Sequence, residues 1–248
     1  MKKLLLLIFI ALMSEGVMAF EAGQLSLDSP NVLKKGEGSF GIRHRFFGEI
    51  NDLDKFFGTD VGGNMHLVLK YALVDNLVLG VDHTRDQSAY GVGLEYSRDF
   101  KWIKMGVRVN GFRLEKGLDV YDKSYQAIVS LQTANYFDHL RFTANVGYDA
   151  YYQHEILGYG VDLNADNFIS FLTFTEKLSL LGEYYPQVDR IEGISKKYNS
   201  YAYGIKYQTY GHHFEIMATN STSMDPRTMS LGTNSDKVHL GFNINRKF

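Results

Sequence analysis

The stretch that decides the fold ends the chain: Lys237-Val238-His239-Leu240-Gly241-Phe242-Asn243-Ile244-Asn245-Arg246-Lys247-Phe248. Its apolar side chains recur at every second position from Val238 to Ile244 and again at Phe248, and polar residues or glycine stand between them. A period of two is that of a β-strand whose two faces meet different surroundings. The stretch therefore predicts a strand with one apolar and one polar face, and it closes on an aromatic residue.

The same alternation recurs along most of the chain and predicts about 12 strands. They cover Gly38–Phe46, Asn64–Leu73, Leu77–Thr84, Ser88–Arg98, Lys101–Leu114, Asp122–Ala134, His139–Tyr151, Asn167–Thr175, Leu178–Tyr185, Tyr198–Thr209, His212–Asn220 and the terminal stretch. The pair Asn167–Thr175 and Leu178–Tyr185 is the least regular, because Ile169, Phe171 and Leu181 fall on the polar face.

The connections between these strands are expected to alternate in length. The longer series is Phe47–Gly63, Glu115–Tyr121, Tyr152–Asp166, Pro186–Lys197 and Ser221–Ser235, with Arg85–Gln87 as its short member. The other series consists of tight turns at Val74–Asn76, Asp99–Phe100, Asn135–Asp138, Glu176–Lys177 and Tyr210–Gly211. Short turns at one end and long loops at the other are typical of barrels in the bacterial outer membrane.

The terminal strand also closely resembles the terminal signal of bacterial outer-membrane β-barrels, which implies that Phe242 and Phe248 are read by the outer-membrane assembly machinery. We therefore predict an all-β fold: an antiparallel transmembrane β-barrel of about 12 strands, with short periplasmic turns and long extracellular loops. Its first and last strands must pair, because backbone that faces lipid needs internal partners. A secreted soluble β-sandwich or lipocalin-like barrel stays open as an alternative, since alternation alone does not exclude it.

The amino terminus predicts secretion. Lys2 and Lys3 precede an apolar run from Leu4 to Met13, and small residues end at Ala19, as in a cleaved signal peptide. The run is half of the about 20 residues that a membrane-spanning anchor needs. We expect a signal peptide over residues 1–19, a periplasmic lead-in over 20–37 and the barrel over 38–248. The chain has no cysteine, so lipoprotein processing, disulfides and thiolate metal sites are excluded.

The polar faces of the strands carry the candidate functional residues. Lumen-lining positions are predicted at Arg43, Arg45, Lys70, Asp82, Glu95, Lys104, Arg108, Arg141, Asp149, Glu183 and Lys206, with Glu215 on the same face. Such a mixture fits a hydrated lumen whose charges pair across strands, or a pore with a weak anion preference. Strand number does not decide, because about 12 lies between filled eight-stranded barrels and open porins. His44 shares the parity of the apolar face and should point outward unless a bulge turns it.

The first third of the chain resembles an uncharacterised family of outer-membrane β-barrels. The likeness lies in Val32-Leu33-Lys34-Lys35-Gly36-Glu37, Phe40-Gly41-Ile42-Arg43-His44-Arg45-Phe46, Phe56-Phe57-Gly58 and Tyr71-Ala72-Leu73-Val74-Asp75-Asn76. This resemblance implies the barrel fold but no activity, so no functional residue follows from it.

Catalytic signals are weak. Outer-membrane phospholipases and deacylases resemble this architecture and use a His–Ser pair on the lipid-facing surface, but here the apolar faces carry no Ser beside a His. His212, His213 and Ser221 are expected at opposite ends of one strand. Asp162–Asp166 lacks the sixth-position Gly and the terminal Glu of a calcium loop. We predict no catalytic residue, metal or cofactor.

The sequence thus predicts a non-enzymatic barrel in the bacterial outer membrane that passes small polar solutes. A closed barrel that acts as a receptor or structural protein through its long loops is the alternative, and a lipid-modifying enzyme is a minor one. The expected partners are outer-membrane lipid and the assembly machinery, without nucleic acid. The sequence does not decide the oligomeric state.

Overall fold

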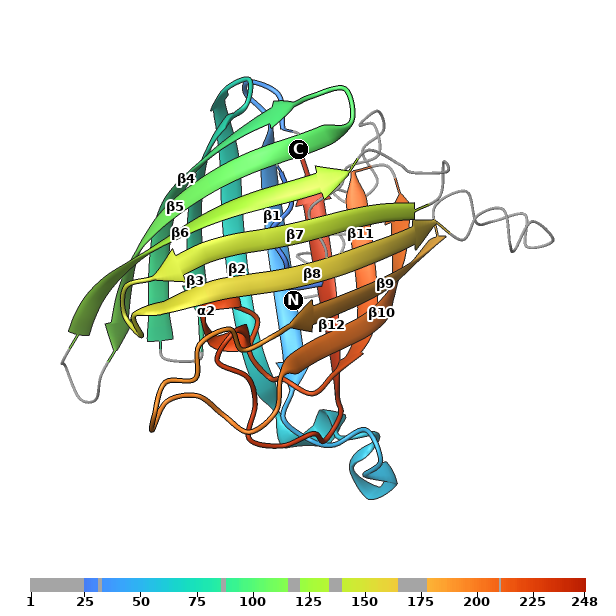
Figure 1. Ribbon diagram of the computed structural model, residues 1–248. Coiled ribbons are helices and arrows are strands. Elements are labelled where there is room, and N and C mark those ends of the chain that lie inside the picture. The colour runs from blue at the N-terminus through green and yellow to red at the C-terminus, as the bar shows by residue number, and fades with distance from the viewer. Residues whose placement is uncertain are drawn as a thin grey trace.

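The computed structural model describes residues 25–30, 33–85, 88–115, 121–133, 140–164, 178–209 and 211–248. Within these residues, twelve antiparallel strands close into one barrel (Figure 1). The strands are β1 Gly38–Phe46, β2 Gly63–Val74, β3 Leu77–Thr84, β4 Ala89–Asp99, β5 Ile103–Glu115, β6 Tyr121–Thr133, β7 Leu140–Asp149, β8 His154–Asn164, β9 Leu178–Tyr185, β10 Ser200–Thr209, β11 His212–Thr219 and β12 His239–Lys247. Short helices occupy two loops: η1 Leu53–Lys55, η2 Thr59–Val61 and α2 Pro226–Met229.

Each strand pairs with its neighbours in sequence, and β1 pairs with β12 to close the ring. In this closing pair Ile42 lies opposite Ile244 and His44 lies opposite Phe242. The amide of Gly38 donates to the carbonyl of Phe248 at 2.8 Å, and the amide of Phe248 donates back at 2.9 Å. The pairing of the first and last strands is thus confirmed, and it removes the two open edges that a sheet would expose.

Alternation along the strands gives the wall two faces. Outward apolar side chains are well exposed, for example Val92 at 58%, Val109 at 52% and Val146 at 53%. Inward polar side chains are buried, as are Gln126 at 1% and Asn145 at 0%. This arrangement is the reverse of that in a soluble protein, because the apolar side chains lie on the outside of the barrel and the polar ones on the inside. His44 lies on the outward face, where its ring stacks on Phe242 at 5.2 Å.

The structure corrects the strand pattern in one place. The loop predicted at Tyr152–Asp166 is wrong: most of it is β8, and the connection from β7 is residues 150–153. Gly158, Gly160 and Asp162 are inward positions of this strand, and its outward positions include Tyr159 and Val161. The remaining predicted strands with an observed counterpart begin and end within two residues of it, and β1, β3 and β9 coincide with their predictions.

The regular alternation of connection lengths fails at the same place. The connection after β7 is short although it belongs to the longer series, and the one after β8 comprises residues 165–177. The strand predicted at Asn167–Thr175 and the turn at Glu176–Lys177 lie outside the described residues, as do the inner parts of Glu115–Tyr121 and Asn135–Asp138.

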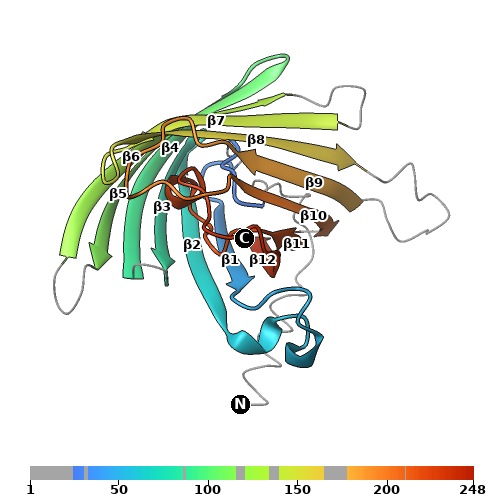
Figure 2. The ribbon, with the colours of Figure 1, turned by 60° about the horizontal axis from the view of Figure 1, so that its bottom comes forward.

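The inside of the barrel is filled by chain that is not part of the wall. One filling segment is residues 25–30, and the other is the β11–β12 connection, 220–238, which carries α2. In Figure 2 the red chain around α2 lies within the ring of strands. Leu25, Leu27, Met224 and Met229 are at most 1% exposed. Among the described residues, no helix has the length and apolar character needed to cross a membrane.

Candidate functional site

Residues 25–30, which we call the strap, run across the inside of the barrel. One end of the strap is held by β1 and β12: the Arg45 guanidinium (Nη2) and the Asn243 amide (Nδ2) both donate to the Leu25 carbonyl, at 3.0 and 2.8 Å. Arg45 is 1% exposed and also donates to the Asn243 side-chain oxygen at 2.9 Å. Both donors lie on inward positions of adjacent strands, so the closing seam of the barrel holds the strap.

The middle of the strap is held by β9 and β7. The Glu183 carboxylate accepts the backbone amides of Ser26 at 2.9 Å and Leu27 at 3.0 Å. The Asn145 side chain forms a two-way pair with Asp28, since its oxygen accepts the Asp28 amide at 2.8 Å and its nitrogen donates to the Asp28 carbonyl at 2.7 Å. These contacts satisfy strap backbone groups as a neighbouring strand would, and so the segment can be buried without a sheet partner.

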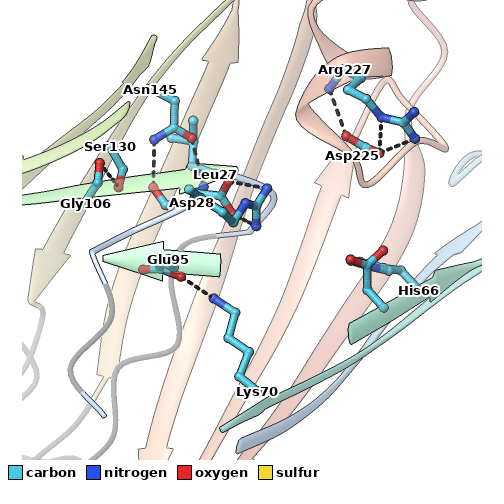
Figure 3. A network of polar contacts seen from close by, with 12 residues as sticks. Leu27, Asp28, His66, Lys70, Glu95, Gly106, Ser130, Asn145, Asp225 and Arg227 are labelled. Atoms are coloured by element: carbon cyan, nitrogen blue, oxygen red, sulfur yellow. Dashed lines mark hydrogen bonds and ion pairs between the residues drawn. The ribbon is translucent and has the colours of Figure 1, made fainter. Parts of the chain in front are cut away.

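The far end of the strap is held by β5. Arg108 donates from Nη1 to the Asp28 carboxylate at 2.6 Å, and Figure 3 shows Asp28 with its other partner, Asn145. In the strand order of the ring, β7 lies opposite β1 and β6 lies opposite β12, and β5 adjoins β6. The strap therefore bridges the cross-section of the barrel. Within the lead-in predicted over residues 20–37, residues 25–30 lie inside the barrel.

Apolar contacts seat the strap between its polar anchors. Leu25 packs with Leu181, Ala202 and Met217, which explains why the inward face of β9 carries a leucine. Leu27 packs with Tyr185 and Met229. A side chain at Gly158 would place its Cβ 2.7 Å from Leu27, so β8 needs glycine at this position. Gly158 thus makes room for the strap and for the Tyr185 ring.

The β11–β12 connection, 220–238, which we call the cap loop, fills the barrel from the end opposite to the strand termini Gly38 and Phe248. Asp225 caps α2 by accepting the Arg227 amide at 2.9 Å, and its carboxylate also accepts Arg227 Nε at 2.6 Å. The guanidinium lies 4.1 Å from the ring centroid of Phe112 on β5. Burial alone would raise the pKa of Asp225, but the Arg227 charge and its hydrogen bonds outweigh it and hold the pKa below its ordinary value.

Ser230, His154 and Asp149 come together where the cap loop meets β7 and β8. His154 Nε2 lies 2.7 Å from Ser230 Oγ, and His154 Nδ1 lies 3.9 Å from an Asp149 oxygen. All three side chains are at most 3% exposed. Ser230 Oγ also lies 2.9 Å from the Pro226 carbonyl, the i−4 bond that ends a helix. Ser230 Oγ therefore has the Pro226 carbonyl, the Arg227 carbonyl and His154 Nε2 within hydrogen-bond distance, and the cluster ties α2 to β8.

Most of the remaining predicted lumen positions form ion pairs or hydrogen bonds within the barrel wall and its turns. Lys70 contacts Glu95 at 3.0 Å, and Asp82 lies 3.4 Å from His66. Lys206 bonds Asp162, and Asp149 accepts the Tyr152 amide at 2.8 Å in the β7–β8 turn. Glu215 contacts His213 at 2.8 Å. Arg43 lines the cavity described below, and Lys104 and Arg141 occupy inward positions of β5 and β7.

Sequence reasoning missed several of the residues that fill the interior. Asn145 and Asn243 lie on inward strand positions that the alternation predicts. The predicted lumen positions include only charged side chains, so these two amides are not among them. Asp162 was missed because it was assigned to a loop. Arg227 and Ser230 had no sequence signal, because the cap loop has no periodicity that reports its position inside the barrel.

A small cavity remains between the strap and the cap loop. Its volume is about 50 Å³, and its polar lining includes Asp28, Arg43, His66, Asp82, Arg108 and Asp225. A cavity of this size holds a few water molecules at most. Within the described residues, no group of three or more His, Asp or Glu side chains could hold a metal ion. Among the described residues, the strap and the cap loop thus leave little free space where they approach each other.

A solved porin shares the fold, and two further solved structures align with the chain at lower scores. The KdgM porin aligns with a TM-score of 0.52 over 85% of this chain and 99% of the porin, at 11% identity. LpxR from Salmonella typhimurium aligns with a TM-score of 0.44 over 86% of this chain and 99% of its own, at 11% identity. Outer membrane phospholipase A from Escherichia coli gives 0.45 over 91% and 96%, at 10% identity. At these identities the likeness is one of fold alone. No curated protein matches the sequence.

A family model described as membrane bound beta barrel domain (DUF5777) matches residues 20–102 and 129–248. The match covers the strap, the cap loop and the closing pair of strands. It confirms the resemblance of the opening segments to an uncharacterised barrel family, and with the closed ring of twelve strands it identifies an outer-membrane β-barrel. The chain therefore belongs to the family of membrane bound beta barrel domains.

Proposed function

We propose that this barrel is a gated, non-enzymatic conduit for small polar solutes, closed in the present conformation by the strap and the cap loop. One observation carries the proposal: what closes the lumen is chain that does not belong to the wall. Side chains fill an eight-stranded barrel permanently. A segment such as residues 25–30 can leave while all twelve strand pairs stay intact.

The contacts of the strap suit a reversible closure. Arg45, Asn145 and Glu183 hold it by hydrogen bonds, and each such bond contributes a net of about 0.5–1.5 kcal/mol. Water can replace these bonds once the strap moves, because the wall groups that it leaves are polar. The inner face would then be lined by cations and carboxylates in nearly equal number, so we expect weak charge selectivity.

Planar-bilayer conductance tests this proposal. The refolded full chain should show rare, brief openings, and a variant without residues 25–30 should show long openings of discrete size. The variant must first show heat-modifiable migration, which reports an intact barrel. If the variant folds but its conductance stays at the baseline of the full chain, the lumen is closed for good and the conduit proposal fails.

A second candidate function, surface recognition, is favoured by the tip of the β1–β2 loop. Leu53 and Phe56 are 68% and 67% exposed there. Phe56 and Phe57 also have φ values of 47° and 57°, a left-handed region that bulky residues rarely adopt. In both views the loop projects beyond the ring of strands (Figures 1 and 2). If deletion of residues 53–61 changes neither conductance nor the binding of any surface partner, this loop has no receptor or gating role.

A further inference from the structure

The outer face of the barrel has a hollow that spans six strands. Its volume is about 730 Å³, and residues of β5 through β10 line it. The smallest residues at its outward positions are Ala144 on β7 and Gly182 on β9, and we call these two the floor of the hollow. The walls are larger and mostly aromatic: Phe142, Tyr159, Val161, Tyr184, Tyr201 and Tyr203.

The register explains why this space stays empty of protein. Gly182 lies opposite Val161 on one side and Tyr203 on the other, so it is a gap in a row of large side chains. A Cβ built at Gly182 meets only the Val161 side chain, at 3.3 Å. The rings of Tyr201 and Tyr203 stack on each other with an interplanar angle of 8° and do not fold over the gap.

From these features we propose that the hollow binds one acyl chain of a membrane phospholipid. Because the protein is a membrane-bound barrel, its outward apolar face meets hydrocarbon and not water. The volume lies within the about 300–1,000 Å³ of small-molecule sites. Strands about 4.8 Å apart make the hollow about 24 Å wide from β5 to β10. An acyl chain that extends through one leaflet, about 15 Å deep, is shorter than this width. The proposal does not depend on whether the lumen conducts.

Filling the floor tests the site. The folded full chain would be equilibrated with vesicles of palmitoyl-oleoyl phosphatidylethanolamine, transferred to detergent, and analysed by native mass spectrometry. The wild type should retain one lipid per barrel. Gly182→Leu and Ala144→Phe, on different strands, should each weaken retention about tenfold, because the added side chain displaces methylene groups from the hollow.

Gly111→Leu is the matched control. Gly111 is an outward glycine of β5 outside the hollow, and a Cβ there would approach only the Val92 carbonyl oxygen, at 4.0 Å. This variant should retain lipid like the wild type. Equal retention in all four proteins, equal losses in the control and the two filling variants, or no retained lipid in the wild type would overturn the proposal. Dimers that the filling variants alone abolish would assign the hollow to a second copy instead.

A readout on the wild type alone guards against variants that do not fold. A phosphatidylethanolamine with a diazirine on its acyl chain should crosslink preferentially to the peptides of β7, β9 and β10 that contain Ala144, Gly182 and Tyr203. Crosslinking spread evenly over the outward faces of β2 to β4 and β7 to β10 would show ordinary solvation by lipid and would also overturn the proposal.

Discussion

At the scale of single residues, the inward carboxylate of Glu183 binds the backbone of the strap. Alternation placed Glu183 on the polar face of its strand, as it placed Arg45 and Arg108. Their partners could not be predicted, because the strap is too short and too irregular to show a period. One carboxylate oxygen accepts the amides of Ser26 and Leu27, and the other also accepts the Ser26 amide, so the side chain of a glutamine would turn its NH2 group toward that amide.

Glu183→Gln should therefore loosen the strap. The chain has no cysteine, so Ser26→Cys supplies a reporter whose thiol is protected while the strap is seated. We expect thiol-reactive labelling of this cysteine to be about tenfold faster with Glu183→Gln, since a buried hydrogen bond lost to one partner costs about 1–3 kcal/mol. Glu95→Gln is the control, because Glu95 is another buried inward carboxylate and pairs with Lys70 on β2. Equal labelling rates in the two variants would contradict this role of Glu183.

At the scale of elements, α2 depends on a charged cap. The pKa of Asp225 is held below its ordinary value of 3.8, and a carboxyl group with a depressed pKa contributes stability that is complete above the unfolded pKa. That contribution is lost as the pH falls through the lower, native pKa. The cap loop should thus keep its protection from neutral pH down to about pH 4 and lose it in stronger acid.

Amide hydrogen exchange of residues 224–232, corrected for the intrinsic effect of pH, measures this change. Wild-type protection should fall by about tenfold or more once Asp225 is protonated, because hydrogen bonds to a charged group contribute about 1.5–3 kcal/mol. Asp225→Asn should be less protected at neutral pH and show no such acid step. An acid step of the same size in Asp225→Asn would assign the change to another group.

The terminal strand carries the prediction about assembly. Phe248 forms both ladder hydrogen bonds with Gly38, and its ring is 58% exposed. Deleting Phe248 leaves an amide and a carbonyl of Gly38 without these partners at the closing seam, and it removes the residue that resembles the assembly signal. We expect less heat-modifiable protein in the outer membrane with unchanged delivery to the periplasm. Phe248→Tyr should behave as the wild type, and normal insertion of the deletion variant would refute the signal.

The elements also show where sequence reading reaches its limit. Strands such as β1, β3 and β9 could be predicted to the residue, because their outward faces are apolar and their ends carry turn residues. The strand β8 could not be predicted in this way. Its inward Gly158 makes room for the side chain of Leu27, a residue far away in sequence. A glycine required by a distant neighbour looks like a glycine required by a turn.

At the scale of the whole molecule, the barrel and its twelve strands follow from local alternation and from the need to pair every lipid-facing backbone group. The state of the lumen does not, because it depends on two segments without regular structure. The sequence left an open pore and a closed barrel as alternatives. The structure shows a barrel with a polar inner face, against which residues 25–30 and the cap loop are packed, and the proposed closure rests on this packing.

The ion pair between Asp28 and Arg108 tests that closure most directly, because it joins the strap to β5, across the barrel interior from the Arg45 and Asn243 anchors. Single-channel recordings would compare Asp28→Arg, Arg108→Asp and the double variant with the wild type. Each single variant places like charges together and should increase the open fraction, and the double variant restores opposite charges and should return it toward the wild-type value. If the double variant is as open as the single ones, or if none differs from the wild type, the strap does not close the barrel.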